Sequence, residues 1–247
     1  MIRQLVPKPA ERPNGFRWRG GHGSRVESFS DAVFAFALTL LVISLSPPRD
    51  FGELNDALGN LLGFAMCFAT LVWVWHEHCV WFRRYGMTDA LTVTINAALL
   101  FVVLFYVYPL RLMFSMLAYR FFGVGGDSAR TLVRGMTWEQ GIDLLVLYGV
   151  GFALIFALFA LLYRRALSAR TTLGLDEIEE YDTRTSLGAC VISTAVAVLS
   201  LVLTGLANMG SAALLPIAGF SYALLGPAHA YWGFRRGRGR SRLAPRA

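Results

Sequence analysis

Residues that could bind a metal ion or transfer a proton lie together at positions 75–78, in the sequence Trp-His-Glu-His. Histidine and glutamate are side chains that hold zinc and activate water in metalloenzymes. However, His76 and His78 are two positions apart, which is roughly 200° around a helix of ~3.6 residues per turn. They cannot bind one ion together from a regular helix, as a pair spaced by four positions can. The motif is therefore a weak signal for a metalloenzyme.

A second polar group comes earlier, where Arg25, Ser30 and Asp31 precede an apolar run. Ser30 and Asp31 are side-chain types that cap the free N–H groups at the start of a helix, so we expect the first helix to begin near them. Alternatively, the group pairs with a partner on another helix at the inner mouth of a membrane span. The candidate partners are His78 and Asn96, a polar residue inside another apolar run. We expect a structural tie from His78 to Asn96 or to Asp31.

The helices that must position these residues are membrane spans, because the chain is too apolar for a soluble domain. Of its 247 residues, 55% are hydrophobic and only 16% are charged. A helix needs ~20 apolar residues to cross a hydrocarbon core of ~30 Å. Runs without Asp, Glu, Lys or Arg that approach or exceed this length cover residues 32–48, 57–76, 90–110, 144–163 and 185–234. The last run is long enough for two spans and carries a turn signal at residues 208–211. The sequence therefore predicts an all-α membrane protein with six transmembrane helices.

The basic residues indicate the orientation of these spans. Six spans place 18 of the 23 Lys and Arg residues on the side that holds both termini. Cytoplasmic loops carry the excess of Lys and Arg, so both termini are predicted to be cytoplasmic. The same placement, together with anionic lipid headgroups, explains the net charge of +7 without nucleic acid as a partner. We expect a disordered basic arm at residues 1–24, a six-helix transmembrane domain at 25–234 and a basic cytoplasmic tail at 235–247.

The first predicted span has an apolar stripe formed by Phe36, Thr39, Leu40 and Ile43, which are spaced to share one helical face. Such a stripe is more often a packing seam between helices than the wall of a pore. No other predicted span is a better pore wall, because none has an Asp or Glu at mid-depth and no TVGYG-like carbonyl filter occurs in the sequence. An ion path through this protein would therefore have an apolar constriction.

The segments with these polar and apolar residues resemble the transmembrane protein 175 family, which comprises the endolysosomal potassium channels and their bacterial relatives. The resemblance is specific over residues 25–110 and rests on hydropathy alone in the remainder. The residues that carry it are Arg25, Phe29, Ser30 and Asp31 (RxxxFSD), then Trp75, His78 and Phe82 (WxxHxxxF), then Asn96 and Pro109.

This resemblance implies a bacterial-type subunit with one six-helix repeat, in a multi-pass arrangement in the bacterial inner membrane. It also implies a homotetramer in which the first helix of each subunit lines a shared axis. The expected partners are other copies of the chain and the lipid bilayer. Counted from Asp31, the constriction positions of the family fall on Phe36, Thr39 and Ile43, with Leu40 on the same stripe. Phe36 replaces the Ile or Leu that is usual at the first position.

We therefore predict a passive channel, either potassium-selective or weakly selective for cations, and not an enzyme. We expect no cofactor. Permeating K⁺ is expected to be held transiently near Thr39. Arg25, Phe29, Ser30, Asp31, Trp75, His78 and Asn96 are expected to form a structural motif. The alternatives are a secondary transporter or structural membrane protein and, less favoured, a membrane enzyme that uses His76, Glu77 and His78.

Overall fold

A computed structural model describes residues 16–20, 23–44, 48–211 and 213–243, and within these ranges every regular element is helical. The elements are α1 (Arg25–Ile43), α2 (Phe51–Gly59), α3 (Leu61–Tyr85), α4 (Ala90–Phe122), α5 (Asp127–Gly135), α6 (Trp138–Ser168), α7 (Arg170–Leu173), α8 (Glu177–Asn208), α9 (Leu214–Phe220), the 3₁₀ turn η1 (Ser221–Leu224) and α10 (Leu225–Leu243). The predicted all-α fold is confirmed for this part of the chain.

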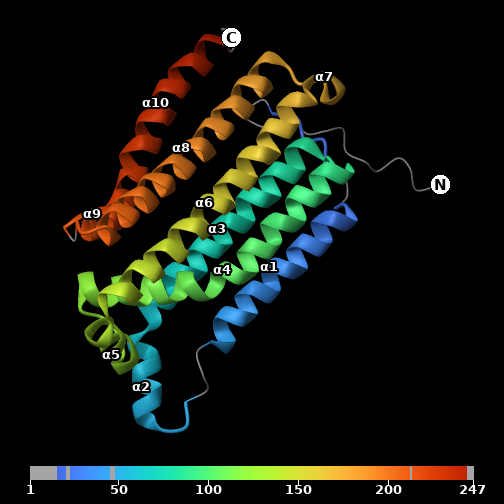
Figure 1. Ribbon diagram of the computed structural model, residues 1–247. Coiled ribbons are helices and arrows are strands. Elements are labelled where there is room, and N and C mark those ends of the chain that lie inside the picture. The colour runs from blue at the N-terminus through green and yellow to red at the C-terminus, as the bar shows by residue number, and fades with distance from the viewer. Residues whose placement is uncertain (1–15, 21–22, 45–47, 212, 244–247) are drawn as a thin grey trace.

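Six long helices, α1, α3, α4, α6, α8 and α10, run side by side, with α1 and α10 at opposite margins (Figure 1). Helix α1 packs against α3 and α4, α4 packs against α6, α6 against α8, and α8 against α10. The chain reverses direction between successive long helices. As a result, the start of α1, helix α7 and the end of α10 lie at one end of the bundle, and α2, α5 and α9 lie at the other (Figure 1).

Most of the predicted membrane spans correspond to helices of sufficient length and apolar character. Helices α1, α4, α6 and α8 each meet this requirement, and α2 and α3 meet it as a pair bent by 50°. The region of the sixth predicted span, which is the part of the run 185–234 after the turn, contains α9, η1 and the start of α10 in its described residues. Pro216 and Pro227 each stand in the first turn of a helix, where proline is tolerated, whereas proline inside a helix would break it. The sixth span remains a prediction.

The first helix begins earlier than we expected. Its N-cap is Ser24, whose hydroxyl accepts a hydrogen bond from the backbone N–H of Glu27 at 3.2 Å. Ser30 and Asp31 are therefore inside α1 and do not cap it. Their side chains are available for contacts with other helices.

Helix α4 is longer than the charge-free run at 90–110 that predicted it. It continues to Phe122 and ends at Gly123, whose φ of +64° is a left-handed conformation that glycine adopts readily. A short helix, α5, follows at 127–135.

The helices approach closely at glycine residues. A Cβ atom added at Gly151 of α6 would lie 2.2 Å from the ring of Tyr106 on α4. The Tyr106 hydroxyl donates a hydrogen bond to the carbonyl of Tyr148 at 2.9 Å. Similarly, a Cβ at Gly63 of α3 would lie 2.7 Å from the Cα of Ser115 on α4. Small residues at such contacts let membrane helices gain packing energy by close backbone approach.

Described residues of both predicted terminal segments contact the bundle. Residues 16–20, which belong to the predicted disordered arm, form no regular element but are bound to the bundle, with Phe16 buried edge-to-face against Tyr85. The remainder of the predicted arm includes residues 1–15 and 21–22, which lie outside the described residues. The described part of the predicted basic tail at 235–247 continues α10 to Leu243, and Arg240 forms an ion pair with Asp182 of α8 at 2.9 Å.

Candidate ion pathway along helix α1

Helix α1 has two faces that differ in exposure. Phe34, Ala37 and Leu41, spaced by three and four positions, are buried against the bundle. On the opposite side, Phe36 is 54% exposed and Ile43 is 65% exposed.

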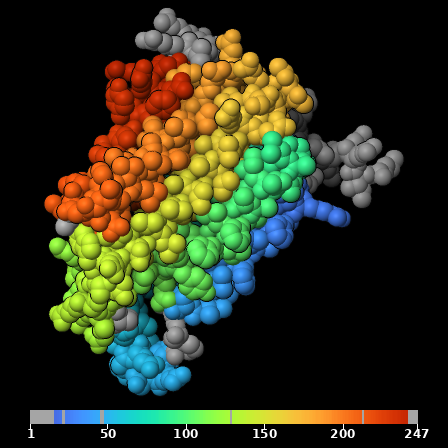
Figure 2. All heavy atoms as spheres, viewed as in Figure 1, coloured from blue at the N-terminus to red at the C-terminus, as the bar shows by residue number. Residues whose placement is uncertain are grey.

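The predicted pore residues share this outward face. Thr39 is exposed between Phe36 and Ile43, and Leu40 is partly buried beside them. The atoms of α1 lie along one margin of the molecule (Figure 2). The stripe predicted from the sequence is therefore not a packing seam within one chain.

The Thr39 hydroxyl has a defined orientation. It donates a hydrogen bond to the backbone carbonyl of Ala35, one turn earlier, at 2.9 Å. This bond uses its single proton and leaves the oxygen lone pairs free to accept. Thr39 therefore presents an oxygen ligand on an otherwise apolar face.

A chain of buried hydrogen bonds holds α1 against two neighbouring helices. The imidazole Nε2 of His78 on α3 lies 2.7 Å from the Oδ1 of Asn96 on α4, and the Nδ2 of Asn96 donates to the Ser30 hydroxyl of α1 at 3.0 Å. Ser30 in turn donates to the carbonyl of Val26 at 2.8 Å. Because an amide oxygen only accepts, Nε2 carries the proton in this pair. The structure thus brings together His78 and Asn96, as predicted, and adds Ser30 as the link to α1.

The other residues of the predicted motif take separate positions. The Asp31 carboxylate accepts a hydrogen bond from the indole N–H of Trp75 at 2.8 Å, which makes a second tie between α1 and α3. Phe29 is exposed beside it. Arg25 is also exposed, and no hydrogen bond or ion pair joins it to Ser30 or Asp31, so polar interactions do not hold these three described residues together.

The segment at residues 16–20 forms a strap, which the sequence did not reveal, across the end of the bundle where α1 begins. The buried carboxylate of Glu179 on α8 accepts from the backbone N–H of Arg17 at 2.7 Å and from the Arg19 guanidinium at 2.5 Å. The N–H groups of Arg19 and Gly20 both donate to the carbonyl of Arg83 on α3 at 3.1 Å. The strap therefore connects α3 to α8 just before α1 begins.

The pairing of Glu179 with the strap could not be predicted from the sequence. The only local signal at Glu179 is its place in a capping box with Asp176, which predicts a helix start and not a partner in the arm.

The Trp-His-Glu-His motif does not form a metal site in the described part of the chain. His76 is exposed, whereas His78 is buried and bound to Asn96. No group of three or more His, Cys, Asp or Glu residues among the described positions could hold a metal ion. Glu77 points instead toward a cavity that is described below.

Comparison with known proteins assigns the chain to a family. The family model described as endosomal/lysosomal potassium channel TMEM175 matches residues 25–106, which include the network and the outward stripe of α1. A protein of Marivirga tractuosa named potassium channel is 38% identical over 217 residues, which is 87% of each chain. A potassium channel of Chamaesiphon minutus is 33% identical over 97 residues, 36% of this chain and 48% of that protein.

A solved structure agrees over nearly the whole fold. The crystal structure of a variant of the potassium channel MtTMEM175, in complex with a nanobody–MBP fusion protein, superposes with a TM-score of 0.80 at 35% sequence identity. The match covers 92% of this chain and 98% of that one. The chain therefore belongs to the TMEM175 potassium channel family.

Proposed function

We propose that the chain is one subunit of a passive potassium channel in the bacterial inner membrane. Four copies surround a central axis, the outward faces of their α1 helices line it, and both termini are cytoplasmic. The relatives in Marivirga tractuosa and Chamaesiphon minutus, and the solved relative, are named potassium channels. The observation that carries the proposal is the outward stripe of Phe36, Thr39 and Ile43.

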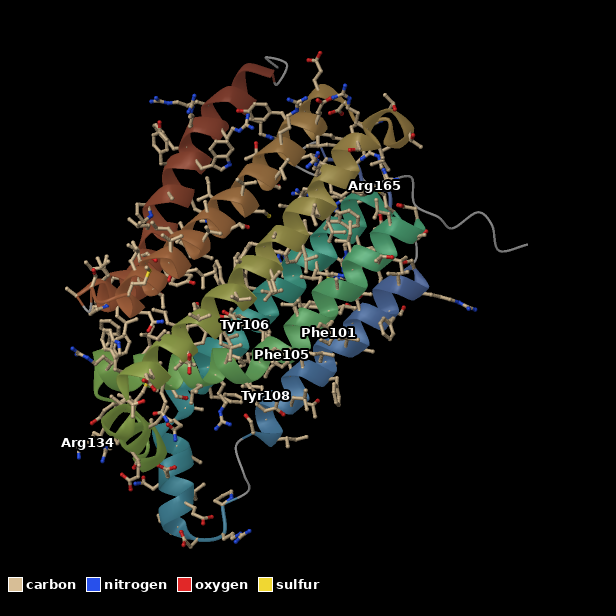
Figure 3. All side chains as sticks on the ribbon, in the orientation of Figure 1. Phe101, Phe105, Tyr106, Tyr108, Arg134 and Arg165 are labelled. Carbon is tan, nitrogen blue, oxygen red and sulfur yellow. The ribbon has the colours of Figure 1, made fainter. Side chains whose placement is uncertain are left out.

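The charges at the two ends of the bundle support this orientation. Most of the described arginines belong to the segments at the end with the start of α1, helix α7 and the end of α10. Arg165 lies at this end, whereas Arg134 on α5 lies at the other (Figure 3). An excess of basic residues marks the cytoplasmic side of a membrane protein.

The chemistry of the stripe favours conduction through a narrow apolar neck. Rings of Phe36 and Ile43 side chains offer no polar group to replace the hydration shell of an ion, so the neck must widen and take up water to conduct. Thr39 hydroxyls between these rings supply oxygen ligands for a partly dehydrated K⁺. The phenyl faces of Phe36 attract a cation weakly through their quadrupole.

The bracing network suits a pore-lining helix. Ser30, Asn96 and His78 fix the rotation of α1 about its own axis by joining its inner face to α3 and α4. Fixing the rotation of α1 keeps Thr39 directed toward the axis.

Electrical recording tests the proposal. In planar bilayers the purified protein should carry a potassium current whose reversal potential follows the potassium gradient. Phe36→Ala should raise the conductance by opening the neck, and Thr39→Ala should reduce the preference for potassium over sodium.

Phe101→Ala is the matched control, because Phe101 is 71% exposed on α4 and lies outside the stripe. This control should leave both quantities unchanged. Unchanged conductance and selectivity in both α1 variants would refute the assignment of the stripe, and saturable exchange in place of current would favour a secondary transporter.

A further inference from the structure

A cavity of about 160 Å³ lies between α3, α6, α8 and α10, and the proposed ion pathway does not use it. The residues of its lining that carry charge, polarity or a ring are Glu77 and Trp73 from α3, Phe156, Phe159 and Tyr163 from α6, Ser186, Cys190 and Ser193 from α8, and His229 from α10. Four helices converge on it, so its shape is set by the bundle and not by a loop.

The carboxylate in this cavity has no partner within the described part of the chain. No hydrogen bond or ion pair joins the Glu77 side chain to another described residue. Glu77 belongs to the bent pair of helices that is apolar enough to span a membrane. Ionisable side chains within a membrane span are costly and are generally retained for a partner or a ligand.

The polar group across the cavity is already engaged. The His229 Nε2 lies 3.0 Å from the Ser193 hydroxyl, which ties α10 to α8. Cys190 of α8 also lines the cavity and is a free thiol. None of these groups supplies a fixed positive charge to balance Glu77.

Four aromatic side chains also line the cavity. The rings of Trp73 and Phe156 have their centroids 5.7 Å apart and are tilted by 40°. Phe159 and Tyr163 are buried on the same side of α6, one turn apart. Several aromatic faces around one carboxylate are the groups that recognise quaternary and primary ammonium ions.

The size and the ligand set favour a small organic cation. On the measure by which a single water molecule needs about 10 to 15 Å³, the cavity of about 160 Å³ has room for a small organic group. Calcium and magnesium ions require six or more oxygen ligands, which one carboxylate with a few hydroxyls cannot supply. Among the described residues, no group of three or more His, Cys, Asp or Glu side chains, such as zinc needs, could hold a metal ion here. A small cation with an apolar outer surface fits both the volume and the rings.

We propose that this cavity binds an alkylammonium group, with Glu77 as its counter-ion and Trp73, Phe156, Phe159 and Tyr163 as its aromatic cage. Two sources share this chemistry, a soluble amine and the amine headgroup of a phospholipid. Glu77 is six positions before Arg83 near the end of α3, about 9 Å along the helix, so a headgroup is within reach.

Binding of radiolabelled tetramethylammonium to the full-length protein tests the proposal, first in nanodiscs made only of phosphatidylglycerol, which has no amine. The wild type should bind it saturably, and Glu77→Gln should weaken binding by about tenfold or more through loss of the counter-ion. Glu77→Asp keeps the charge and should retain part of the affinity. Glu139→Gln, at an exposed position on α6, is the matched control and should bind like the wild type.

A second set of nanodiscs that contain phosphatidylethanolamine distinguishes the two sources. Competition by this lipid in the wild type would identify a headgroup as the occupant, and its absence would identify a soluble amine. Size-exclusion elution at the wild-type volume checks that Glu77→Gln is folded. Equal affinity in the wild type and a folded Glu77→Gln, or no saturable binding in the wild type, would overturn the proposal.

Discussion

Replacing Asn96 by leucine should weaken the attachment of α1 to the bundle. Asn96 is buried and makes two hydrogen bonds to other helices, to His78 at 2.7 Å and to Ser30 at 3.0 Å. Leucine has a similar size but cannot make either bond. The buried N–H of His78 then loses its partner, and the Ser30 hydroxyl keeps only its bond to the carbonyl of Val26.

The expected cost follows from these two bonds. Hydrogen bonds between helices in a membrane contribute about 0.6 kcal/mol on average and up to about 1.7 kcal/mol. Asn96→Leu should therefore lower the free energy of unfolding by about 1 to 3 kcal/mol. Thr94→Val on the same helix is the matched control, because the Thr94 hydroxyl bonds only to the carbonyl of Ala90 in its own helix. Its effect should stay within about 0.5 kcal/mol.

Unfolding in mixed micelles of increasing denaturing detergent, followed by circular dichroism, measures these differences. A double-mutant cycle with Ser30→Ala isolates the link to α1. The double variant should lose less stability than the sum of the two single variants, because both remove the same bond. Additive losses, or equal losses for Asn96→Leu and Thr94→Val, would refute the bracing network.

Three further predictions concern packing, the strap and acid stability. Gly151→Ala should destabilise the fold by about 1 to 3 kcal/mol in the same unfolding assay, since its methyl group would overlap the Tyr106 ring, whereas Gly205→Ala meets open space and should not. Glu179→Gln should release the strap and speed hydrogen exchange at the amides of Arg17, Arg19 and Gly20, measured by mass spectrometry, and unchanged protection would contradict the role of Glu179. Hydrogen bonds from Thr92 and the charge of Arg165 hold the pKa of Asp89 below its usual value. The ionised Asp89 therefore stabilises the fold fully above the pKa that it has in the unfolded state. This stabilisation is lost as the pH falls through the lower pKa of the folded state. Asp89→Asn should therefore flatten the loss of stability below about pH 4, and an unchanged pH profile would count against it.

Features that repeat along one helix could be predicted from the sequence. Charge-free runs of about 20 residues predicted five regions that the structure shows as long helices or as the bent pair α2 and α3. The turn at residues 208–211 was predicted by its residue types, and Gly210 there has a φ of +118°. The outward stripe on α1 was also predictable, because spacing by three and four positions fixes which side chains share a face.

Pairings between distant segments could not be predicted in this way. Glu179 binds Arg17 and Arg19 across about 160 positions of sequence, and no periodic pattern connects a carboxylate in one helix to an extended arm. The composition of the arm indicated disorder, because it shows only what the arm itself can form. The contacts that hold residues 16–20 come from α3 and α8.

The cavity beside Glu77 could not be predicted from the sequence for a related reason. Its neighbours His76 and His78 suggest a metal motif, but in the helix they point elsewhere, and the cavity is completed by residues of three other helices. Its site becomes visible only when α6, α8 and α10 are packed against α3.

Block of a Thr39→Cys channel by cadmium tests most directly whether the outward face of α1 lines the ion path. The variant is made in a background in which Cys67, Cys79 and Cys190 are replaced by serine, and potassium current is recorded before and after cadmium is added. We predict reversible block of Thr39→Cys and no block of Phe101→Cys, whose side chain lies on α4 outside the stripe. A potassium current that cadmium leaves unchanged in Thr39→Cys would contradict the account.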